Sequence, residues 1–177
     1  MKLFSGTKHE IQPIDRKQTA YVVCSSCTLK FTEHNMKYDD ASWHYGGDFP
    51  EGQPEEHGGT HIALFLKWCF ARGWVGSLHM EEEPDAIGAV VSGKMSATDF
   101  LFKYCDGKFI DEDLNEVGNC FTARYYGDDG LYLDDYAEVF GDLMYVAPEA
   151  AHDYQKFSTM LDDRYATGIL SKSQLKS

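Results

Sequence analysis

Residues 60–73 read THIALFLKWCFARG, and almost every position from 62 to 70 carries a large apolar side chain. Thr60 belongs to the residue types that cap helix starts, and Gly73 suits the left-handed conformation that follows a helix end. A helix with scarcely any polar face has to be covered by other elements on several sides. The stretch therefore predicts a buried central helix around which the rest of the fold is arranged.

The sequence after this helix predicts further helices. Beyond an acidic connection, Pro84 begins a short helix, and Ser96 forms a capping pair with Asp99 that opens the next one. Apolar residues at helical spacing predict a helix from about Glu112 to Tyr126. Another follows in LYLDDYAEVFG, and the last begins at Pro148.

The sequence before the central helix is typical of strands and loops. Residues 20–24 and 28–32 are rich in β-forming side chains and are separated by small polar residues, which predicts a hairpin. Residues 37–59 contain five glycines and two prolines, which predicts a long ordered loop. The expected fold is α+β, with an amino-terminal hairpin or small sheet packed against a mainly helical body of about five helices. Residues 1–170 are expected to form one domain, and 171–177 a flexible polar tail.

The composition is that of a folded protein without a membrane span. The chain has 177 residues, of which 43% are hydrophobic and 14% aromatic. The longest apolar run, at 62–66, is far shorter than the roughly 20 residues that span a bilayer. Five cysteines form no even disulfide pattern, and the amino terminus has no secretory signal pattern, so a reducing cytoplasm is the expected location.

The charge of the chain is strongly negative and unevenly distributed. The formal net charge is −13, and residues 81–163 contain 20 acidic but only five basic residues. Such a segment repels nucleic acid and anionic membranes and attracts cationic partners. The alternative is that the acidic residues only keep the protein soluble.

Most motifs that could indicate chemistry are incomplete. The CSSC pair at 24–27 has no second ligand pair for zinc, and the strand-like TLKFT that follows argues against a redox motif. DEDLNE resembles the start of a calcium loop, but Glu116 and Thr122 stand where Gly and Glu are needed. No complete catalytic set is present, and no cofactor is expected.

Three histidines near the central helix form one candidate site. His44, His57 and His61, with Asp48 between them, could converge on a metal ion. The two glycines in HGGTH place His57 outside the helix that begins near His61, so hydrogen bonding within the loop is the alternative.

The segment YDDASWHYGGDFPEGQPEEHGGTHIALFLKWC, residues 38–69, is the most distinctive part of the sequence. Trp43, Tyr45 and Phe49 are binding anchors if they are exposed, and structural packing residues if they are not. Together with DGKFIDEDLNEVGNCFTARYYGDDGLYLDDYAEVF, the segment resembles the signature of a family of small bacterial proteins of unassigned activity, over about residues 36–165. Such small acidic bacterial proteins resemble the immunity proteins that are encoded beside secreted toxins.

The leading functional hypothesis is an immunity protein that binds and neutralises a cognate antibacterial toxin with a basic surface. The alternative is a metal-binding protein or enzyme that uses His44, Asp48, His57 and His61. No contact with nucleic acid or membrane is expected. The candidate partner-binding residues are Trp43, His44, Tyr45, Asp48, Phe49, Glu81, Glu82, Glu83, Asp85, Asp111, Glu112, Asp113, Asp128 and Asp129.

Overall fold

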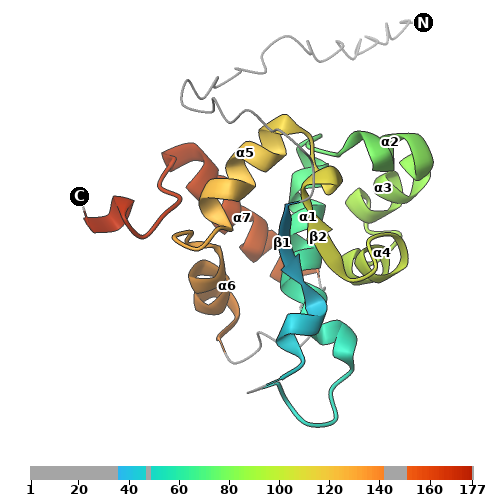
Figure 1. Cartoon of the computed structure of the whole chain (residues 1–177), viewed down its shortest axis with the longest axis horizontal. Coiled ribbons are helices and arrows are strands. Elements are labelled where there is room, and N and C mark those ends of the chain that lie inside the picture. Colours follow the sequence, from blue (N-terminus) through green and yellow to red (C-terminus); the bar gives the residue numbers. More distant parts are fainter. Residues whose placement is uncertain (1–35, 47–48, 142–150, 177) are drawn as a thin grey trace, which may run out of the picture. The chain divides into compact units, whose positions relative to one another are not determined.

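A computed structural model describes residues 36–46, 49–141 and 151–176. In this part of the chain a two-stranded antiparallel sheet accompanies seven α-helices, so the predicted α+β class is confirmed (Figure 1). The strands are β1 (Lys37–Asp40) and β2 (Lys108–Ile110). The helices are α1 (Thr60–Ala71), α2 (Ser77–Glu82), α3 (Pro84–Val91), α4 (Ala97–Tyr104), α5 (Glu116–Tyr125), α6 (Tyr132–Phe140) and α7 (Ala151–Thr167), with 3-10 turns η1 (Ala41–His44), η2 (Glu55–Gly59), η3 (Asp111–Asp113) and η5 (Gln174–Lys176).

The sheet joins two segments that lie far apart in the sequence. β1 pairs with β2, and the register shifts between Lys37 and Asp39, which is the mark of a β-bulge. Residues 37–40 were expected to begin a loop, and β2 was not predicted. The predicted hairpin at 20–24 and 28–32 lies outside the described residues.

The central position predicted for α1 is confirmed. Figure 1 shows α2, α3 and α4 on one side of α1 and α5 and α6 on the other. Phe65 has no exposed surface, and its ring meets Phe121 of α5, Tyr132 of α6 and Phe109 of β2 at centroid distances of 6.3, 4.9 and 5.7 Å. The helix therefore forms the centre of one aromatic core.

Thr60 does not cap α1 as predicted. Gly59 occupies the N-cap position, and no side chain caps the helix. The reason is that η2 runs directly into α1, so that the backbone N–H of Thr60 donates to the carbonyl of His57. At the other end Gly73 has φ 74°, the left-handed conformation that the sequence predicts.

The other helix starts agree with the sequence in part. Pro84 lies in the first turn of α3, and the Ser96 side chain accepts from the backbone N–H of Asp99 at the start of α4. The helix predicted from Glu112 begins at Glu116, because the preceding acidic residues form η3 and Asn115 caps α5. At the residues of α2 the sequence predicts an acidic connection and not a helix. Pro148 lies outside the described residues.

The carboxyl-terminal segment is paired with the turn between α5 and α6. Ser171 forms an isolated β-bridge with Gly130, and the backbone N–H of Lys172 donates to the Asp129 carbonyl at 2.8 Å. The side chain of Ser173 donates to the Asp129 carboxylate at 2.6 Å. Ser171, Lys172 and Ser173 thus make specific contacts, although they belong to the segment 171–177 that the sequence predicts to be a flexible tail.

None of the helices in the described ranges combines the length and apolarity needed to cross a membrane.

Candidate functional site

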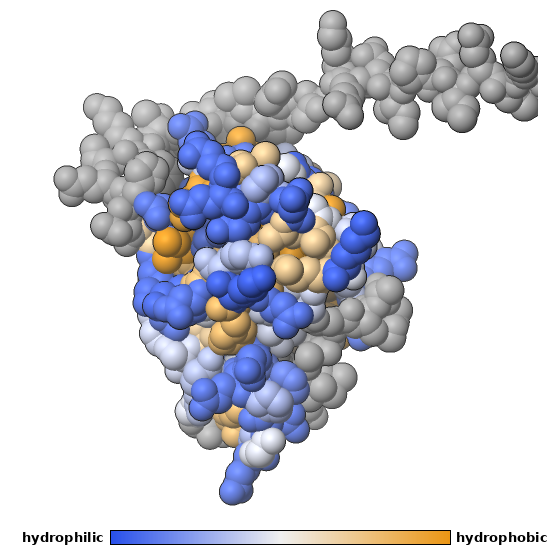
Figure 2. All heavy atoms as spheres, turned by 90° about the vertical axis from the view of Figure 1, so that its right-hand side faces the viewer, coloured by the Kyte–Doolittle hydropathy of each residue, from blue (hydrophilic) through white to orange (hydrophobic). Residues whose placement is uncertain are grey.

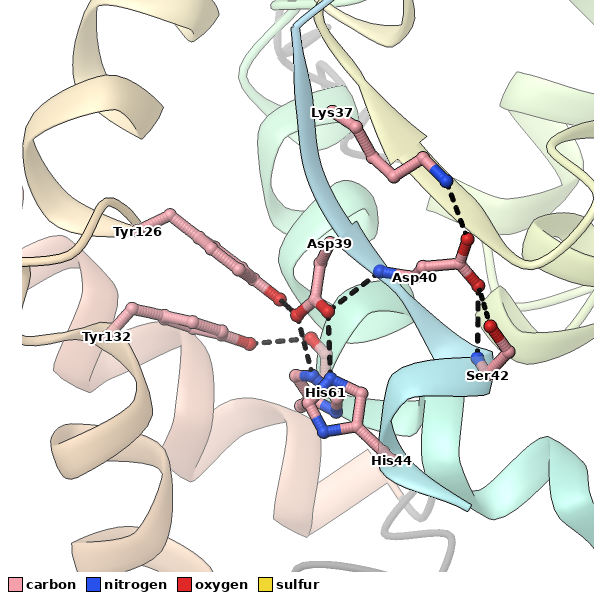
Figure 3. A network of polar contacts seen from close by, with 8 residues as sticks. All are labelled: Lys37, Asp39, Asp40, Ser42, His44, His61, Tyr126 and Tyr132. Carbon is pink, nitrogen blue, oxygen red and sulfur yellow. Dashed lines mark hydrogen bonds and ion pairs between the residues drawn. The ribbon is translucent and has the colours of Figure 1, made fainter. Parts of the chain in front are cut away.

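Asp39, at the end of β1, is the centre of a buried polar cluster (Figure 3). Its Oδ1 accepts from Nε2 of His44 at 2.8 Å and from the backbone N–H of Asp40 at 2.7 Å. Its Oδ2 accepts from Nε2 of His61 at 3.0 Å and from the Tyr126 hydroxyl at 2.6 Å. Both imidazoles donate when their hydrogen is on Nε2. Four donors thus converge on one carboxylate that is 4% exposed.

Four elements hold this cluster in place. His44 comes from η1, whose start is fixed by Asp40, because that carboxylate accepts from the backbone N–H and hydroxyl of Ser42 at 3.1 and 2.7 Å. His61 comes from the first turn of α1, and its carbonyl accepts from the hydroxyl of Tyr132. Strand β1 and the end of α5 supply Asp39 and Tyr126. The cluster is therefore built on the core of the fold.

The electrostatics of the cluster favour a carboxylate beside a neutral imidazole. Burial raises the pKa of Asp39, but hydrogen bonds from the two imidazoles and from Tyr126 outweigh burial and hold the pKa well below its usual value. Burial lowers the pKa of His61, and Asp39 offsets this only in part. Burial also raises the pKa of Tyr126, with a further contribution from Asp39, so its hydroxyl stays protonated.

The histidine loop proposed from the sequence is brought together only in part. His44 and His61 meet, with ring centroids 4.4 Å apart, whereas His57 is not among the residues grouped with them. Asp48 lies outside the described residues. The carboxylate of the cluster comes from Asp39, which the sequence reasoning missed, although two consecutive acidic residues before the Trp-His pair were a visible signal.

A second cluster surrounds His79 of α2, which is 2% exposed. Its Nε2 lies 2.8 Å from Oδ1 of Asp113, and its Nδ1 lies 3.5 Å from Oε2 of Glu83. The Sγ of Cys105 lies 3.8 Å from the same Nε2. The rings of Phe70 and Phe100 pack against the imidazole.

The second cluster does not have the arrangement of an activated cysteine. In a nucleophile–His–Asp triad the nucleophile and the acid contact opposite ring nitrogens, whereas Cys105 and Asp113 share one. Burial and Asp113 raise the pKa of Cys105 far above its usual value. Burial lowers the pKa of His79, but Asp113 and Glu83 outweigh burial and raise it. A buried thiol with a raised pKa lacks the environment that activates a nucleophilic cysteine.

The acidic residues predicted to form one surface fall into different environments. Asp111 and Asp113 are 2% and 3% exposed, so their assignment to the surface is wrong. The Asp111 carboxylate accepts from the backbone N–H of Met36, and that of Asp113 from the backbone N–H of Ile110. These two hydrogen bonds hold η3 in place beside β1 and β2. Glu83, another of the predicted acidic residues, faces His79.

Four predicted acidic residues remain exposed on one side of the fold, namely Glu81, Glu82, Asp85 and Glu112. Leu78 and Met80 of α2 lie among them and are 40% and 54% exposed. Leu78, Glu81 and Glu112 line a common open depression between α2 and η3. These six residues are called the α2–η3 surface below. Figure 2 shows the face that carries α2, α3 and α4, where hydrophilic side chains alternate with small apolar areas.

The other acidic residues lie elsewhere, and three of them, Asp129, Asp134 and Asp135, have partners. Asp128 and Asp129 are exposed in the turn between α5 and α6, where Asp129 binds Ser173. Asp134 forms an ion pair with Lys172 at 2.9 Å, and Asp135 is buried against Arg164. In Figure 1 the turn between α5 and α6 lies on the side of the molecule away from α2.

The aromatic residues of the loop are not equally exposed. Trp43 is 60% exposed, with the ammonium group of Lys37 5.4 Å from its ring centroid. Tyr45 and Phe49 are half-buried and meet each other at a centroid distance of 6.1 Å. In Figure 1 η1 lies at the lower end of the sheet and α2 at the upper right. The candidate partner-binding residues therefore form separate groups and not one patch.

Comparison with known proteins gives one match. No curated protein and no solved structure matches the chain significantly. A family profile with the description "Domain of unknown function (DUF7832)" matches residues 37–153. The matched range begins at β1 and covers both clusters and the α2–η3 surface. Since it includes most of the chain, the protein belongs to the family described as "Domain of unknown function (DUF7832)".

Proposed function

We propose that the protein binds and neutralises a basic protein partner through the α2–η3 surface, as an immunity protein does for a secreted antibacterial toxin. One observation carries the proposal. Among the residues that the structure describes, Glu81, Glu82, Asp85 and Glu112 are exposed and form no ion pair.

The sequence explains why these carboxylates have no cationic neighbours along the chain. No lysine or arginine occurs between Arg72 and Lys94, or between Lys108 and Arg124. The first interval contains α2 and α3, and the second contains η3 and most of α5. Two exposed acidic residues of α6 and α7 do have cationic partners, because Asp134 pairs with Lys172 and Asp162 with Arg72. The α2–η3 surface combines four exposed carboxylates that form no ion pair among the described residues, so its negative field is available to an external cation.

Apolar groups within this surface can exclude water from the centre of an interface, which charged groups alone do not do. Leu78 and Met80 of α2 are exposed, Leu78 lines the same depression as Glu81 and Glu112, and Met is suited to adaptable contacts. In protein interfaces, apolar groups at the centre exclude water, while charges at the rim guide association. The surface has both components, and such a field disfavours nucleic acid and anionic membranes. The proposal places the protein in the cytoplasm of the bacterium that makes the toxin.

The test compares two variants with the same change in net charge. The first carries Glu81→Gln, Glu82→Gln, Asp85→Asn and Glu112→Gln, and the control carries Asp128→Asn, Asp134→Asn, Glu138→Gln and Asp163→Asn. The probe is the product of the adjacent gene, first tested for toxicity and for rescue by co-expression. Association and dissociation rates are then measured at about 50 and 300 mM NaCl, where screening differs strongly.

We expect the first variant to associate at least about tenfold more slowly at low salt and to lose most of its dependence on salt. The control should keep the wild-type rate within about threefold, and both variants should remain folded. Equal effects in the two variants would show that only net charge matters. A neighbouring product that is harmless alone, or that stays toxic when this protein is well expressed, would refute the immunity function.

Trp43, an exposed aromatic residue of η1, tests in the same assay whether the partner also contacts η1. If the partner reaches η1, Trp43→Ala should raise the dissociation rate, because exposed aromatic side chains are common anchors. An unchanged dissociation rate would confine the interface to the α2–η3 side.

A further inference from the structure

We propose that Asp39, His44 and His61 form a binding site for one divalent transition-metal ion, with zinc as the reference ion. The proposal is independent of the toxin-binding function. It rests on the positions of three side chains from β1, η1 and α1, whose ligand atoms all lie within 4.8 Å of one another.

The distances between the ligand atoms are slightly shorter than those around a shared ion. Zinc lies about 2.0–2.2 Å from imidazole nitrogen and carboxylate oxygen, so two ligands at a tetrahedral angle are about 3.3–3.6 Å apart. The two nitrogen–oxygen distances are 2.8 Å for His44 and 3.0 Å for His61. Both rings present Nε2 to the carboxylate (Figure 3). Small side-chain shifts therefore suffice to admit an ion between the three groups.

The set of donor atoms narrows the choice of ion. Two imidazoles and one carboxylate are the ligands of non-haem iron and of many zinc sites, with further positions left for water or substrate. Calcium and magnesium prefer oxygen ligands and are disfavoured here. Both rings bind a metal as neutral imidazoles through Nε2, so the remaining ring hydrogen then lies on Nδ1.

The surroundings keep the three ligands in position before an ion arrives. The Tyr126 hydroxyl donates to Oδ2 of Asp39, a contact of the kind that orients carboxylate ligands in metal sites. Asp39 and His61 are almost fully buried, whereas the His44 side chain is 23% exposed. The His44 side is thus the route by which an ion and its remaining water ligands reach the cluster.

The His79 cluster is the competing place for an ion in the described part of the chain. Its candidate ligands are His79, Cys105 and Asp113, and a thiol has to lose its proton before it can bind a metal. Any test must therefore separate the two clusters.

The experiment uses the full chain, produced without a histidine tag and freed of metal with a chelator. Zinc binding is measured by calorimetry, and cobalt is titrated as a probe because its absorption spectrum reports on its ligands. His44→Ala removes the most exposed ligand and is the variant most certain to fold. His57→Gln is the matched control, since His57 lies in the neighbouring turn and outside the cluster. Cys105→Ser tests the competing site, and circular dichroism checks the fold of each variant.

We expect one zinc ion per chain in the wild type, in His57→Gln and in Cys105→Ser. His44→Ala should weaken zinc binding at least about tenfold, because loss of a ligand costs no less than the 10- to 100-fold typical of losing a supporting hydrogen bond. The proposal is overturned if zinc does not bind the wild type, if His44→Ala binds it equally well, or if only Cys105→Ser loses it.

Discussion

Single residues in this fold often have a chemistry that their neighbours in the sequence do not reveal. His61 and His79 are both almost fully buried histidines that contact aspartate, yet burial dominates the pKa of the first and carboxylates dominate that of the second. The difference is that Glu83 adds a second carboxylate beside His79. The pKa values of two similar histidines are thus shifted in opposite directions.

The state of His79 makes a prediction about pH. Its pKa is raised above the value of 6.5 for an unperturbed histidine, so its stabilising contribution is fully present below that pH and is lost as pH rises through the folded-state pKa. The groups that face it are Asp113, Glu83 and Cys105. The difference in free energy of unfolding between wild type and His79→Gln should therefore be larger at about pH 5.5 than at about pH 9.

Urea unfolding at both pH values measures this difference. Asp113→Asn removes the nearer carboxylate and should reduce the same pH dependence, which ties the effect to the pair. A difference between wild type and His79→Gln that stays constant, or that grows with pH, would contradict the assignment of a protonated imidazole.

At the scale of elements, α1 organises the helices around it. Trp68 is 2% exposed, contacts Trp74 and Phe121 at centroid distances of 5.3 Å, and donates from Nε1 to Asp162 of α7 at 2.9 Å. Arg72 pairs with the same carboxylate. The last turns of α1 therefore hold α5 and α7 together by both packing and hydrogen bonding.

Truncation of Trp68 is expected to be severe. Trp68→Ala should lower the free energy of unfolding by about 3–5 kcal/mol, because it leaves a large cavity in the core and removes the hydrogen bond to Asp162. Trp43→Ala removes the same side chain from a site that is 60% exposed and should change stability by only about 0.5 kcal/mol. Denaturant unfolding of the two variants gives the comparison. Equal losses would show that α1 is not central to stability.

Most of the local helix signals of the sequence were confirmed, with Thr60 as the exception. Pro84, Ser96 and Gly73 each act in the predicted role, because caps and turn conformations depend on neighbouring residues. The sequence missed α2, which is only six residues long and contains three polar or charged side chains among its last four positions. Such a short helix is stabilised by its packing on α3 and η3 and not by its own propensity.

At the scale of the whole molecule, the charge of −13 opposes folding through repulsion. Ion pairs offset this repulsion on α6 and α7 but, within the described residues, not on the α2–η3 surface. Because screening acts most strongly on exposed charges, added salt should raise the thermal midpoint. Melting curves at about 20 and 300 mM NaCl test this, and the variant neutralised at Glu81, Glu82, Asp85 and Glu112 should show a smaller rise. A midpoint that falls with salt would mean that attractive pairs dominate.

The sequence by itself determined the features that depend on composition and local pattern. A stretch of apolar side chains as dense as 62–70 can only be buried, whatever surrounds it, so the central helix was predictable. The α+β class followed from the same patterns, and the predicted membership in a family of unassigned activity agrees with the profile match over residues 37–153. His44 and His61 of the Asp39 cluster were predictable as candidate metal ligands, because histidines gather near the start of the central helix.

Only the tertiary structure decided which residues meet. Asp39 is buried because β1 pairs with β2 about seventy residues later, and no local pattern encodes such a pairing. The same holds for the acidic residues, which look alike in the sequence but separate into buried, paired and exposed groups. Burial and ion pairing depend on partners that are distant in the chain. A charge count can therefore predict an excess of acidic residues, but only the packing of α2 against η3 brings Glu81 and Glu112 to the same depression.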